Sequence, residues 1–137
     1  MERFWFRHFS GTTLVGTRGD DRPVALVIGF VGTADPTRGV IHLVAVAPGV
    51  RRQGTGRTLV EALEERLGAA GATTVEAVTW PGNRGGIRFL EALGYEPVAE
   101  SRATPLFGVP AIANYDGEGE DRAIMERALP RQPRNSP

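Results

Sequence analysis

A glycine-rich turn between an apolar strand and an amphipathic helix carries the clearest chemical signal in this sequence. The stretch runs from His42 to Arg57 and reads His-Leu-Val-Ala-Val-Ala-Pro-Gly-Val-Arg-Arg-Gln-Gly-Thr-Gly-Arg. The first N–H groups of a helix lack intrahelical partners and lie at the positive end of the helix dipole, so they bind phosphate well. Gly54 and Gly56 allow a ligand to approach closely. The sequence therefore predicts an anion site at this turn.

Two nucleotide-binding motifs fail at the same turn. Gly49 and Gly54 have the spacing of a phosphate loop, but Thr55 stands where that loop needs lysine. Gly54 and Gly56 begin a dinucleotide fingerprint, but Leu59 stands where the third glycine belongs. These mismatches exclude a phosphate-loop NTPase and a dinucleotide-binding fold.

A third pattern fits. The run Arg51-x-x-Gly54-x-Gly56, after a strand ending Val-x-Val-x-Pro, resembles the pyrophosphate-binding motif of the GNAT N-acetyltransferases. A second run, Asn83-x-x-Gly86-x-x-Phe89-x-x-x-x-Gly94-Tyr95, is similar to the helix that follows in that family. The order and separation of both motifs agree over residues 23–95, and residues 121–129 resemble the family's last strand. An early Trp-Phe-Arg and a late Tyr-Asp-Gly-x-Gly-Glu-Asp-Arg, residues 115–122, resemble a bacterial subgroup.

The resemblance implies an α/β fold with a mixed, mostly antiparallel sheet flanked by helices, and acetyl-CoA as acyl donor. Backbone groups of Val44, Ala45 and Val46 would pair with the pantetheine arm, and the Val46 N–H would polarise the thioester carbonyl. Asn83 would hydrogen-bond the pantetheine or phosphate region. The pyrophosphate would be held by N–H groups of Arg52, Gln53, Gly54, Thr55, Gly56 and Arg57, with the charge of Arg51 or Arg52. The alternative for these arginines is a solvated helix start.

Acyl transfer to an amine needs a base, because an amine with a pKa near 10 is protonated at neutral pH. His42 is the first candidate: strand alternation predicts that it shares a face with Val44 and Val46. A packed, hydrogen-bonded histidine is the alternative. Glu76, on the next strand, is a second candidate base, or an ordinary exposed glutamate.

The leaving thiolate raises a separate question. Many members of the family resembled place a tyrosine proton donor four residues before the Gly-Phe pair, where this chain has Leu90. Leucine cannot donate a proton. Tyr115, with Asp116 and Glu118 in a glycine-rich segment, is the candidate replacement acid, and a plain surface turn is the alternative.

Other aromatic residues and His8 offer weaker candidates. Trp80, at a predicted strand end near Asn83, either lines an acceptor site or packs. Core and sheet-surface roles are favoured over a substrate pocket for His8, Phe4, Trp5, Phe6 and Phe9.

The elements that must position these groups follow from periodicity. Strands are predicted at Arg3–Phe9, Thr12–Arg18, Pro23–Val31, Val40–Ala47, Thr73–Thr79 and Asp121–Leu129, and after Tyr95. Helices are predicted over Thr55–Leu67, with Leu59, Val60, Leu63 and Leu67 inward and Glu61, Glu64, Glu65 and Arg66 outward, and over Asn83–Leu93, with Ile87, Leu90 and Leu93 inward. Residues 102–120 are predicted as loop. We expect a single domain over residues 1–129 and a disordered tail over residues 130–137.

Composition narrows the class of protein. The 137 residues are 41% hydrophobic, carry no net charge and contain no cysteine and two histidines. All 16 basic residues are arginine, which excludes lysine chemistry. A metal site, a nucleic-acid partner and a membrane partner are therefore not expected, and the cytoplasm is the expected compartment.

The N-terminal region departs from the family pattern, because only Ser10 and Gly11 separate two predicted strands that the family usually joins through two helices. The acceptor side is therefore open, closed by residues 102–120, or completed by the second subunit of a homodimer; a truncated start is a further alternative. The leading hypothesis is an acetyl-CoA-dependent N-acetyltransferase with an unidentified amine acceptor. The rivals are a CoA-binding protein of this fold with another acyl chemistry or a regulatory role, and a small interaction domain.

Overall fold

The structure is a computed structural model that describes residues 9–17, 19, 21–51, 53–98, 104–106 and 108–130. The chain divides into two compact units: residues 1–75 with 128–137, and residues 76–127. Several sequence-based predictions fall outside the described residues. These are the strand at residues 3–8, the tail at 131–137, and the roles of Phe4, Trp5, Phe6, His8 and Arg52.

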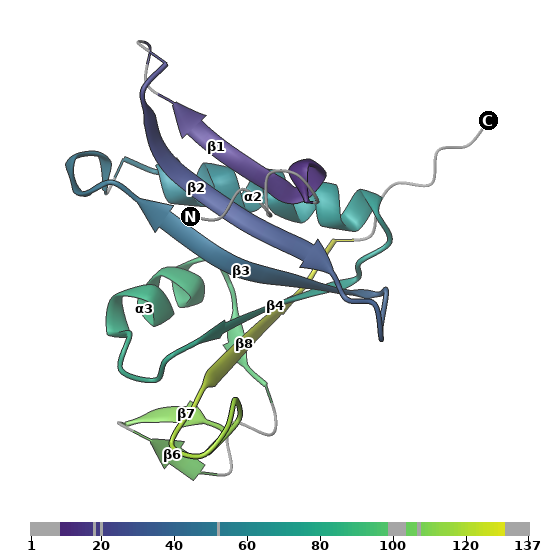
Figure 1. Ribbon diagram of the computed structural model, residues 1–137, viewed down its shortest axis with the longest axis vertical. Coiled ribbons are helices and arrows are strands. Elements are labelled where there is room, and N and C mark those ends of the chain that lie inside the picture. Colours follow the sequence, from purple (N-terminus) through teal and green to yellow (C-terminus); the bar gives the residue numbers. More distant parts are fainter. Residues whose placement is uncertain are drawn as a thin grey trace. The chain divides into compact units, whose positions relative to one another are not determined.

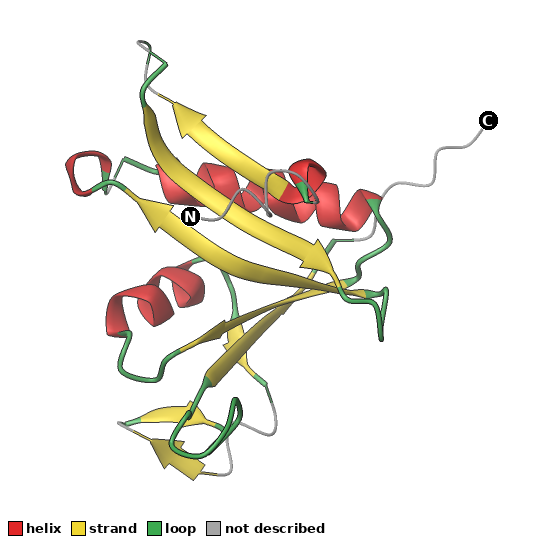
Figure 2. Cartoon of the chain, in the orientation of Figure 1, coloured by secondary structure: helices red, strands yellow, loops and turns green. Residues whose placement is uncertain are grey.

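The first unit is built on three antiparallel strands and one long helix (Figures 1 and 2). After the short 3-10 helix η1 (Ser10–Thr12), strands β1 (Thr13–Thr17), β2 (Pro23–Val31) and β3 (Arg38–Val46) pair in sequence order. A second 3-10 helix, η2 (Pro48–Val50), leads into helix α2 (Thr55–Ala69). Strand β4 (Thr74–Thr79) begins in this unit and continues into the second.

The second unit contains helix α3 (Arg84–Ala92) and the strands β5 (Glu96–Pro97), β6 (Thr104–Leu106), β7 (Val109–Ala111) and most of β8 (Ala123–Ala128). Strands β5 and β8 pair antiparallel, and β6 and β7 form a separate two-stranded sheet. The strand order of the main sheet is β1-β2-β3-β4-β8-β5. The predicted mixed sheet with flanking helices is confirmed.

Helix α2 packs on one face of the first unit's strands because its apolar residues recur at helical spacing. Val60, Leu63 and Leu67 have no exposed surface. An added Cβ at Gly29 of β2 would lie 2.8 Å from Leu63 Cδ2, and one at Gly39 of β3 would lie 3.0 Å from Leu67 Cδ1. Glycine at these two positions therefore lets the helix lie close against the sheet.

Within the described residues, the predicted helices and strands are present in the structure, with small shifts at their ends. The helices that were predicted from residues 55 and 83 begin at Thr55 and at the N-cap Asn83, and Leu59, Ile87, Leu90 and Leu93 are buried as expected. One assignment on α2 is wrong: Glu64 is 6% exposed. It follows Val60 by four residues and precedes Leu67 by three, which places it on the apolar stripe despite its charge.

The loop prediction for residues 102–120 is also wrong in part. Residues 104–106 and 109–111 form the β6–β7 hairpin, in which Pro105 is opposite Pro110. Prolines favour a loop reading because they cannot donate to a ladder, but a short edge pairing tolerates them.

Candidate functional site

Strand β3 contains a β-bulge at His42. Ile28 of β2 is paired with Leu43, but the next residue, Gly29, is paired with Ile41, which leaves His42 as the extra residue. The bulge has a steric requirement, since a Cβ at Gly29 would lie 2.7 Å from the Val40 carbonyl oxygen. An isolated glycine inside an apolar strand is a recognised sign of a bulge, and it could have revealed this feature from the sequence.

The bulge overturns one expectation about His42. Residues paired across a ladder share a face, so Val44 lies with Val27, and Ile41 with Gly29, on the face that α2 covers. Leu43 lies with Ile28 on the opposite face. His42, which follows Ile41, is directed to that opposite face and is exposed. It therefore does not share a face with Val44 and Val46, because the bulge interrupts the alternation on which the expectation depended.

The backbone groups of Val44 and Val46 point to the edge of β3 away from β2. The Ala47 N–H donates to the Val24 carbonyl at 2.8 Å, which identifies that pair as hydrogen-bonded. Hydrogen-bonded and non-hydrogen-bonded pairs alternate in an antiparallel ladder. Val46 and Val44 therefore occupy non-hydrogen-bonded pairs, whereas Ala45 directs its backbone groups to β2. The register is consistent with donor pairing by Val44 and Val46 but does not support that role for Ala45.

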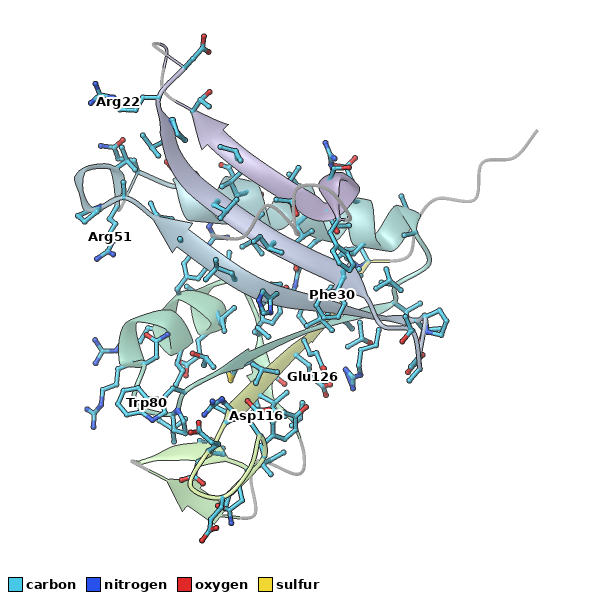
Figure 3. All side chains as sticks on the ribbon, in the orientation of Figure 1. Arg22, Phe30, Arg51, Trp80, Asp116 and Glu126 are labelled. Atoms are coloured by element: carbon cyan, nitrogen blue, oxygen red, sulfur yellow. The ribbon has the colours of Figure 1, made fainter. Side chains whose placement is uncertain are left out.

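The turn after β3 closes on itself before α2 begins. The Val50 N–H donates to the Ala47 carbonyl at 3.0 Å, and Arg51 Nε donates to the Val46 carbonyl at 3.2 Å. Arg51 lies beside this turn in Figure 3. Gly54, the N-cap of α2, has φ of 79° and contributes no side-chain cap. Helix geometry therefore leaves the first N–H groups of α2, from Thr55 and Gly56, without intrahelical partners.

Arg57, in the first turn of α2, forms an ion pair within its own helix. Arg57 Nη1 lies 3.6 Å from Glu61 Oε1, one turn along α2. Gln53 is exposed and stands next to Gly54. The described members of the predicted phosphate set, residues 53–57 with Arg51, thus follow the end of β3 directly in the first unit.

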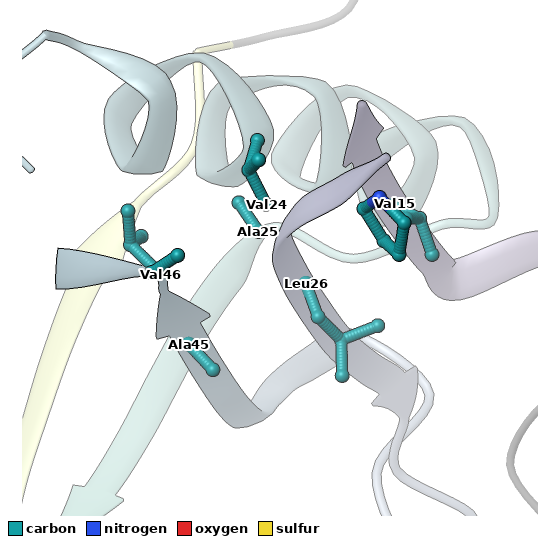
Figure 4. A pocket seen from close by; sticks show the side chains of 8 residues that line it. Val15, Val24, Ala25, Leu26, Ala45 and Val46 are labelled. Atoms are coloured by element: carbon teal, nitrogen blue, oxygen red, sulfur yellow. The ribbon is translucent and has the colours of Figure 1, made fainter. Parts of the chain in front are cut away.

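An open apolar groove of about 470 Å³ lies at the same end of the first unit (Figure 4). It is lined by Val15 of β1, residues 23–26 of β2, Ala45 and Val46 of β3, and Ala47 directly after β3. Val15, Leu26 and Ala45 share the face away from α2. Every lining side chain is apolar, so the groove suits a hydrocarbon group better than a charged one.

In the second unit, the Asn83 side chain caps α3. Asn83 Oδ1 accepts from the Gly86 N–H at 3.1 Å, and Nδ2 donates to Thr79 Oγ1 at 3.0 Å. Both functional atoms of the amide therefore already have a partner within this unit. Trp80, 56% exposed, lies so close to Gly82 that a Cβ there would be 2.2 Å from its ring. Glu76 lies on β4 and is half-buried.

The candidate acid Tyr115 is 45% exposed and belongs to a loop, residues 113–121, that is closed by internal hydrogen bonds. Asn114 Oδ1 accepts from the Gly119 N–H at 2.8 Å, and Asp121 Oδ1 accepts from the Asn114 N–H at 2.9 Å. Arg122 lies 2.8 Å from both Asp116 Oδ2 and Glu120 Oε2. The hydrogen bond to Glu120, with both carboxylate charges, raises the pKa of Arg122 above its ordinary value.

Leu90, which stands at the acid position of the family that the sequence resembles, lies in the interior of the second unit. Leu90 is 6% exposed and Tyr95 is 2% exposed, and the Tyr95 N–H donates to the Leu90 carbonyl at 3.0 Å. The structure thus places His42, Val44, Val46, Arg51 and residues 53–57 in the first unit, and Glu76, Asn83, Leu90 and Tyr115 in the second.

The described residues contain neither a metal-binding cluster nor a membrane-spanning helix. No three side chains of His, Cys, Asp or Glu gather in this part of the chain in a way that could hold a metal ion. None of the helices described here has the length and apolar character required to cross a membrane.

Comparisons with known proteins agree on one family. The model of the acetyltransferase (GNAT) family matches residues 1–95. The L-2,4-diaminobutyric acid acetyltransferase of Nocardia farcinica is 35% identical over 103 residues, which cover 75% of this chain and 53% of that protein. This chain therefore spans about half the length of the curated relative it matches.

Two solved structures illustrate the similarity of fold. Ard1 from Thermoplasma volcanium superposes with a TM-score of 0.73 at 21% identity, covering 93% of this chain and 77% of that one. The ribosomal-protein-S18-alanine N-acetyltransferase from Escherichia coli has a TM-score of 0.62 at 26% identity, covering 95% and 80%.

Proposed function

This chain belongs to the GNAT acetyltransferase family, and from that premise we propose that it transfers an acetyl group from acetyl-CoA to an amine of a small molecule or a protein terminus. The observation that carries the proposal is the direct succession of two features: backbone groups of Val44 and Val46 that are directed away from β2, and a start of α2 at Gly54 that has no side-chain cap. The strand backbone at Val44 and Val46 suits an amide-bearing arm, and the helix start at Gly54 suits a pyrophosphate.

The donor would lie along the first unit. Its pantetheine arm would pair with the backbone of Val44 and Val46 as an added strand. Its pyrophosphate would take N–H groups from residues 52–57 at the start of α2, where the helix dipole favours negative charge. Asn83 is proposed to contact the donor through the second hydrogen of Nδ2, because the first is donated to Thr79.

The transfer step is a nucleophilic substitution at the thioester carbonyl. The amine nitrogen forms the C–N bond, the C–S bond breaks, and the amine loses a proton to a base. We assign that base to His42, because a neutral imidazole nitrogen can accept a proton. The oxyanion would be stabilised by the Val46 N–H.

Proton return to the leaving thiolate would not involve Leu90, whose buried hydrocarbon side chain has no proton to give. A thiol with a pKa near 8.5 leaves more readily than the amine, so modest help is enough. Tyr115 is the proposed donor of that proton. Leu90 is also the reason to retain a second candidate function, a CoA-binding protein of this fold that performs another acyl chemistry or a regulatory role.

The proposed partners follow from this chemistry. We propose acetyl-CoA as the cosubstrate, no metal ion, no nucleic acid, no membrane, and a cytoplasmic setting in which acetyl-CoA is available. A homodimer that completes the acceptor side remains part of the proposal because β1 lies at the edge of the main sheet among the strands that the structure describes.

A thermal melt of the purified chain with acetyl-CoA tests donor binding. A ligand at a hundredfold over its Kd adds about 2.7 kcal/mol, which is a Tm rise of roughly 5–10 °C for a domain of this size. Free CoA and ATP serve as comparison ligands. A Tm that acetyl-CoA leaves unchanged, with no binding heat in calorimetry, would refute the donor site and favour an interaction domain.

Thiol release with a panel of amines then tests transfer. With an accepted amine, His42→Ala should lower kcat/KM about 100-fold or more near neutral pH, and the deficit should narrow at high pH, where the amine loses its proton to solvent. His42→Gln is the matched variant, since it preserves polarity but cannot act as the base. A wild-type rate in His42→Ala at every pH would remove this assignment.

A further inference from the structure

Arg51 makes one contact that the pyrophosphate motif does not require. Its Nε donates to the Val46 carbonyl at 3.2 Å, across the turn that separates β3 from α2. Val46 contributes its backbone to the proposed donor strand, and Arg51 begins the segment that leads to Gly54. This single side chain therefore bridges the two parts of the proposed donor site.

The contact fixes a specific peptide unit. The carbonyl of Val46 and the N–H of Ala47 belong to the same planar group. The N–H is held by the Val24 carbonyl at 2.8 Å, and the carbonyl is held by Arg51 Nε at 3.2 Å. With both ends bonded, this peptide plane cannot rotate without losing a hydrogen bond, and the Val46 N–H beside it is restrained in turn.

We propose that Arg51 is a positioning residue, which aligns the Val46 backbone for the acyl donor through the Val46 carbonyl rather than neutralising the pyrophosphate. The inference rests on the proposed donor site. A carbonyl oxygen has two lone pairs, so the Val46 oxygen accepts from Arg51 and still has capacity for a pantetheine amide. What the site needs from residue 51 is a donor at the Nε position, and the charge is secondary.

Side-chain geometry provides a matched pair of variants. Glutamine carries Nε2 the same number of bonds from Cα as arginine carries Nε, so Arg51→Gln retains the donor and removes the charge. Methionine places its terminal Cε methyl at that position, so Arg51→Met removes both. Arg57→Gln and Arg57→Met are the matched control pair, because Arg57 lies in the same motif but is directed to Glu61 at 3.6 Å.

The first experiment measures the Kd of acetyl-CoA by calorimetry for the wild type and these four variants. Arg51→Met should bind about fivefold more weakly, the usual worth of one hydrogen bond, and Arg51→Gln should stay within about twofold of the wild type. The two Arg57 variants should have equal Kd values for acetyl-CoA. If Arg51→Gln is as weak as Arg51→Met, the charge matters and the inference is overturned. It is overturned equally if neither variant changes the Kd.

The second experiment follows backbone amide exchange in the protein without ligand. Exchange of the Ala47 N–H should accelerate in Arg51→Met and remain slow in Arg51→Gln. Because this readout needs no donor, it separates the two proposals. Unchanged exchange in Arg51→Met overturns the positioning role alone. Normal exchange behaviour with no binding of acetyl-CoA to the wild type overturns the proposed function and, with it, any role of Arg51 in donor alignment.

Discussion

Each unit of this chain contains a strand, a turn and a helix, and the two helices begin in different ways. Helix α2 follows β3 and starts at Gly54, which has no side chain to satisfy the first N–H groups. Helix α3 follows β4 and starts at Asn83, whose Oδ1 accepts from the Gly86 N–H at 3.1 Å. The same local architecture thus gives α2 a start without a side-chain cap and α3 a start at which a side chain accepts from one N–H group.

The difference shows that a glycine-rich turn is not by itself a binding site. The loop at residues 113–121 is as rich in glycine as the turn before α2, but its N–H groups at Asp116, Gly119 and Glu120 are bonded within the loop. What distinguishes the turn before α2 is that its hydrogen bonds hold the preceding strand end. They leave the helix start without a cap.

The largest expected effect concerns the bulge in β3, the strand that precedes α2. Gly29→Ala would bring its Cβ 2.7 Å from the Val40 carbonyl oxygen, and backbone cannot give way cheaply. We expect a loss of about 2–3 kcal/mol in the free energy of unfolding, measured by urea denaturation. Gly85→Ala in α3 is the control: its Cβ meets nothing within 4 Å, and alanine favours a helix. Equal stability of the two variants would argue against a bulge at this place.

The next effect concerns the uncapped helix start. Gly54 has φ of 79°, so Gly54→Ala should cost about 1–2 kcal/mol and weaken acetyl-CoA binding as the first N–H groups of α2 shift. Gly49→Ala is the matched variant, since Gly49 has open space around it and its φ is not positive. Thermal melts with and without acetyl-CoA measure both quantities. Identical melts for the two variants would show that the left-handed conformation at Gly54 is dispensable.

The third effect concerns the start of α3, where stability should depend on the side chain of the N-cap residue Asn83. Asn83→Ala should cost about 1 kcal/mol in stability because α3 loses its cap. Asn83→Asp retains the oxygen that accepts from Gly86 but loses the donor, so it should remain near wild-type stability. If Asn83→Asp still weakens acetyl-CoA binding in calorimetry, Nδ2 contacts the donor; retained binding would confine Asn83 to the cap.

The smallest effect concerns the hairpin between β2 and β3, where a side chain also organises a turn. Thr37 Oγ1 donates to Asp35 Oδ1 at 2.6 Å and the Thr37 N–H donates to the same oxygen at 3.1 Å. These bonds, the hydroxyl first, hold the pKa of Asp35 below its ordinary value of 3.8. A lowered pKa stabilises the folded state above the unfolded-state value, and that stability is lost as pH falls through the folded value.

The variant that tests this hairpin is Thr37→Val, which removes the hydroxyl and preserves the branched shape. Its Tm deficit should therefore be greatest at neutral pH and should shrink below about pH 4. Melts from pH 2 to pH 7 measure the trend. A deficit that grows on acidification would contradict the role of the Asp35 carboxylate.

Most of the fold follows from local patterns in the sequence. Strand β2 ends where alternation and turn residues predict, and α2 and α3 begin at the expected residues, because apolar spacing and terminal glycines act over short distances. Glu64 is the exception within an element. Its charged residue type predicts exposure to solvent, but its position between Val60 and Leu67 places it in the core. The spacing of apolar residues is therefore a better predictor of burial on such a helix than residue type.

Less of the candidate site could be predicted from the sequence. The order of Val44, Val46, Arg51 and Gly54 could be predicted because the residues are adjacent. Alternation alone gives the wrong direction for His42. Gly29 indicates a bulge from the sequence, but which strand contains the extra residue depends on how β2 pairs with β3. The contact from Arg51 to Val46 likewise depends on how the intervening turn folds, and no residue type predicts it.

The extra residue in β3 has a consequence for anyone who redesigns this strand. The extra residue reverses the alternation of the strand. Before His42, odd-numbered positions such as Gly39 and Ile41 face α2, and after it even-numbered positions such as Val44 do. A library that alternates polar and apolar codons across the whole strand would therefore place charge against the core on one side of the bulge. Deleting His42 would restore a single parity and would also move Leu43 into the position that His42 now occupies.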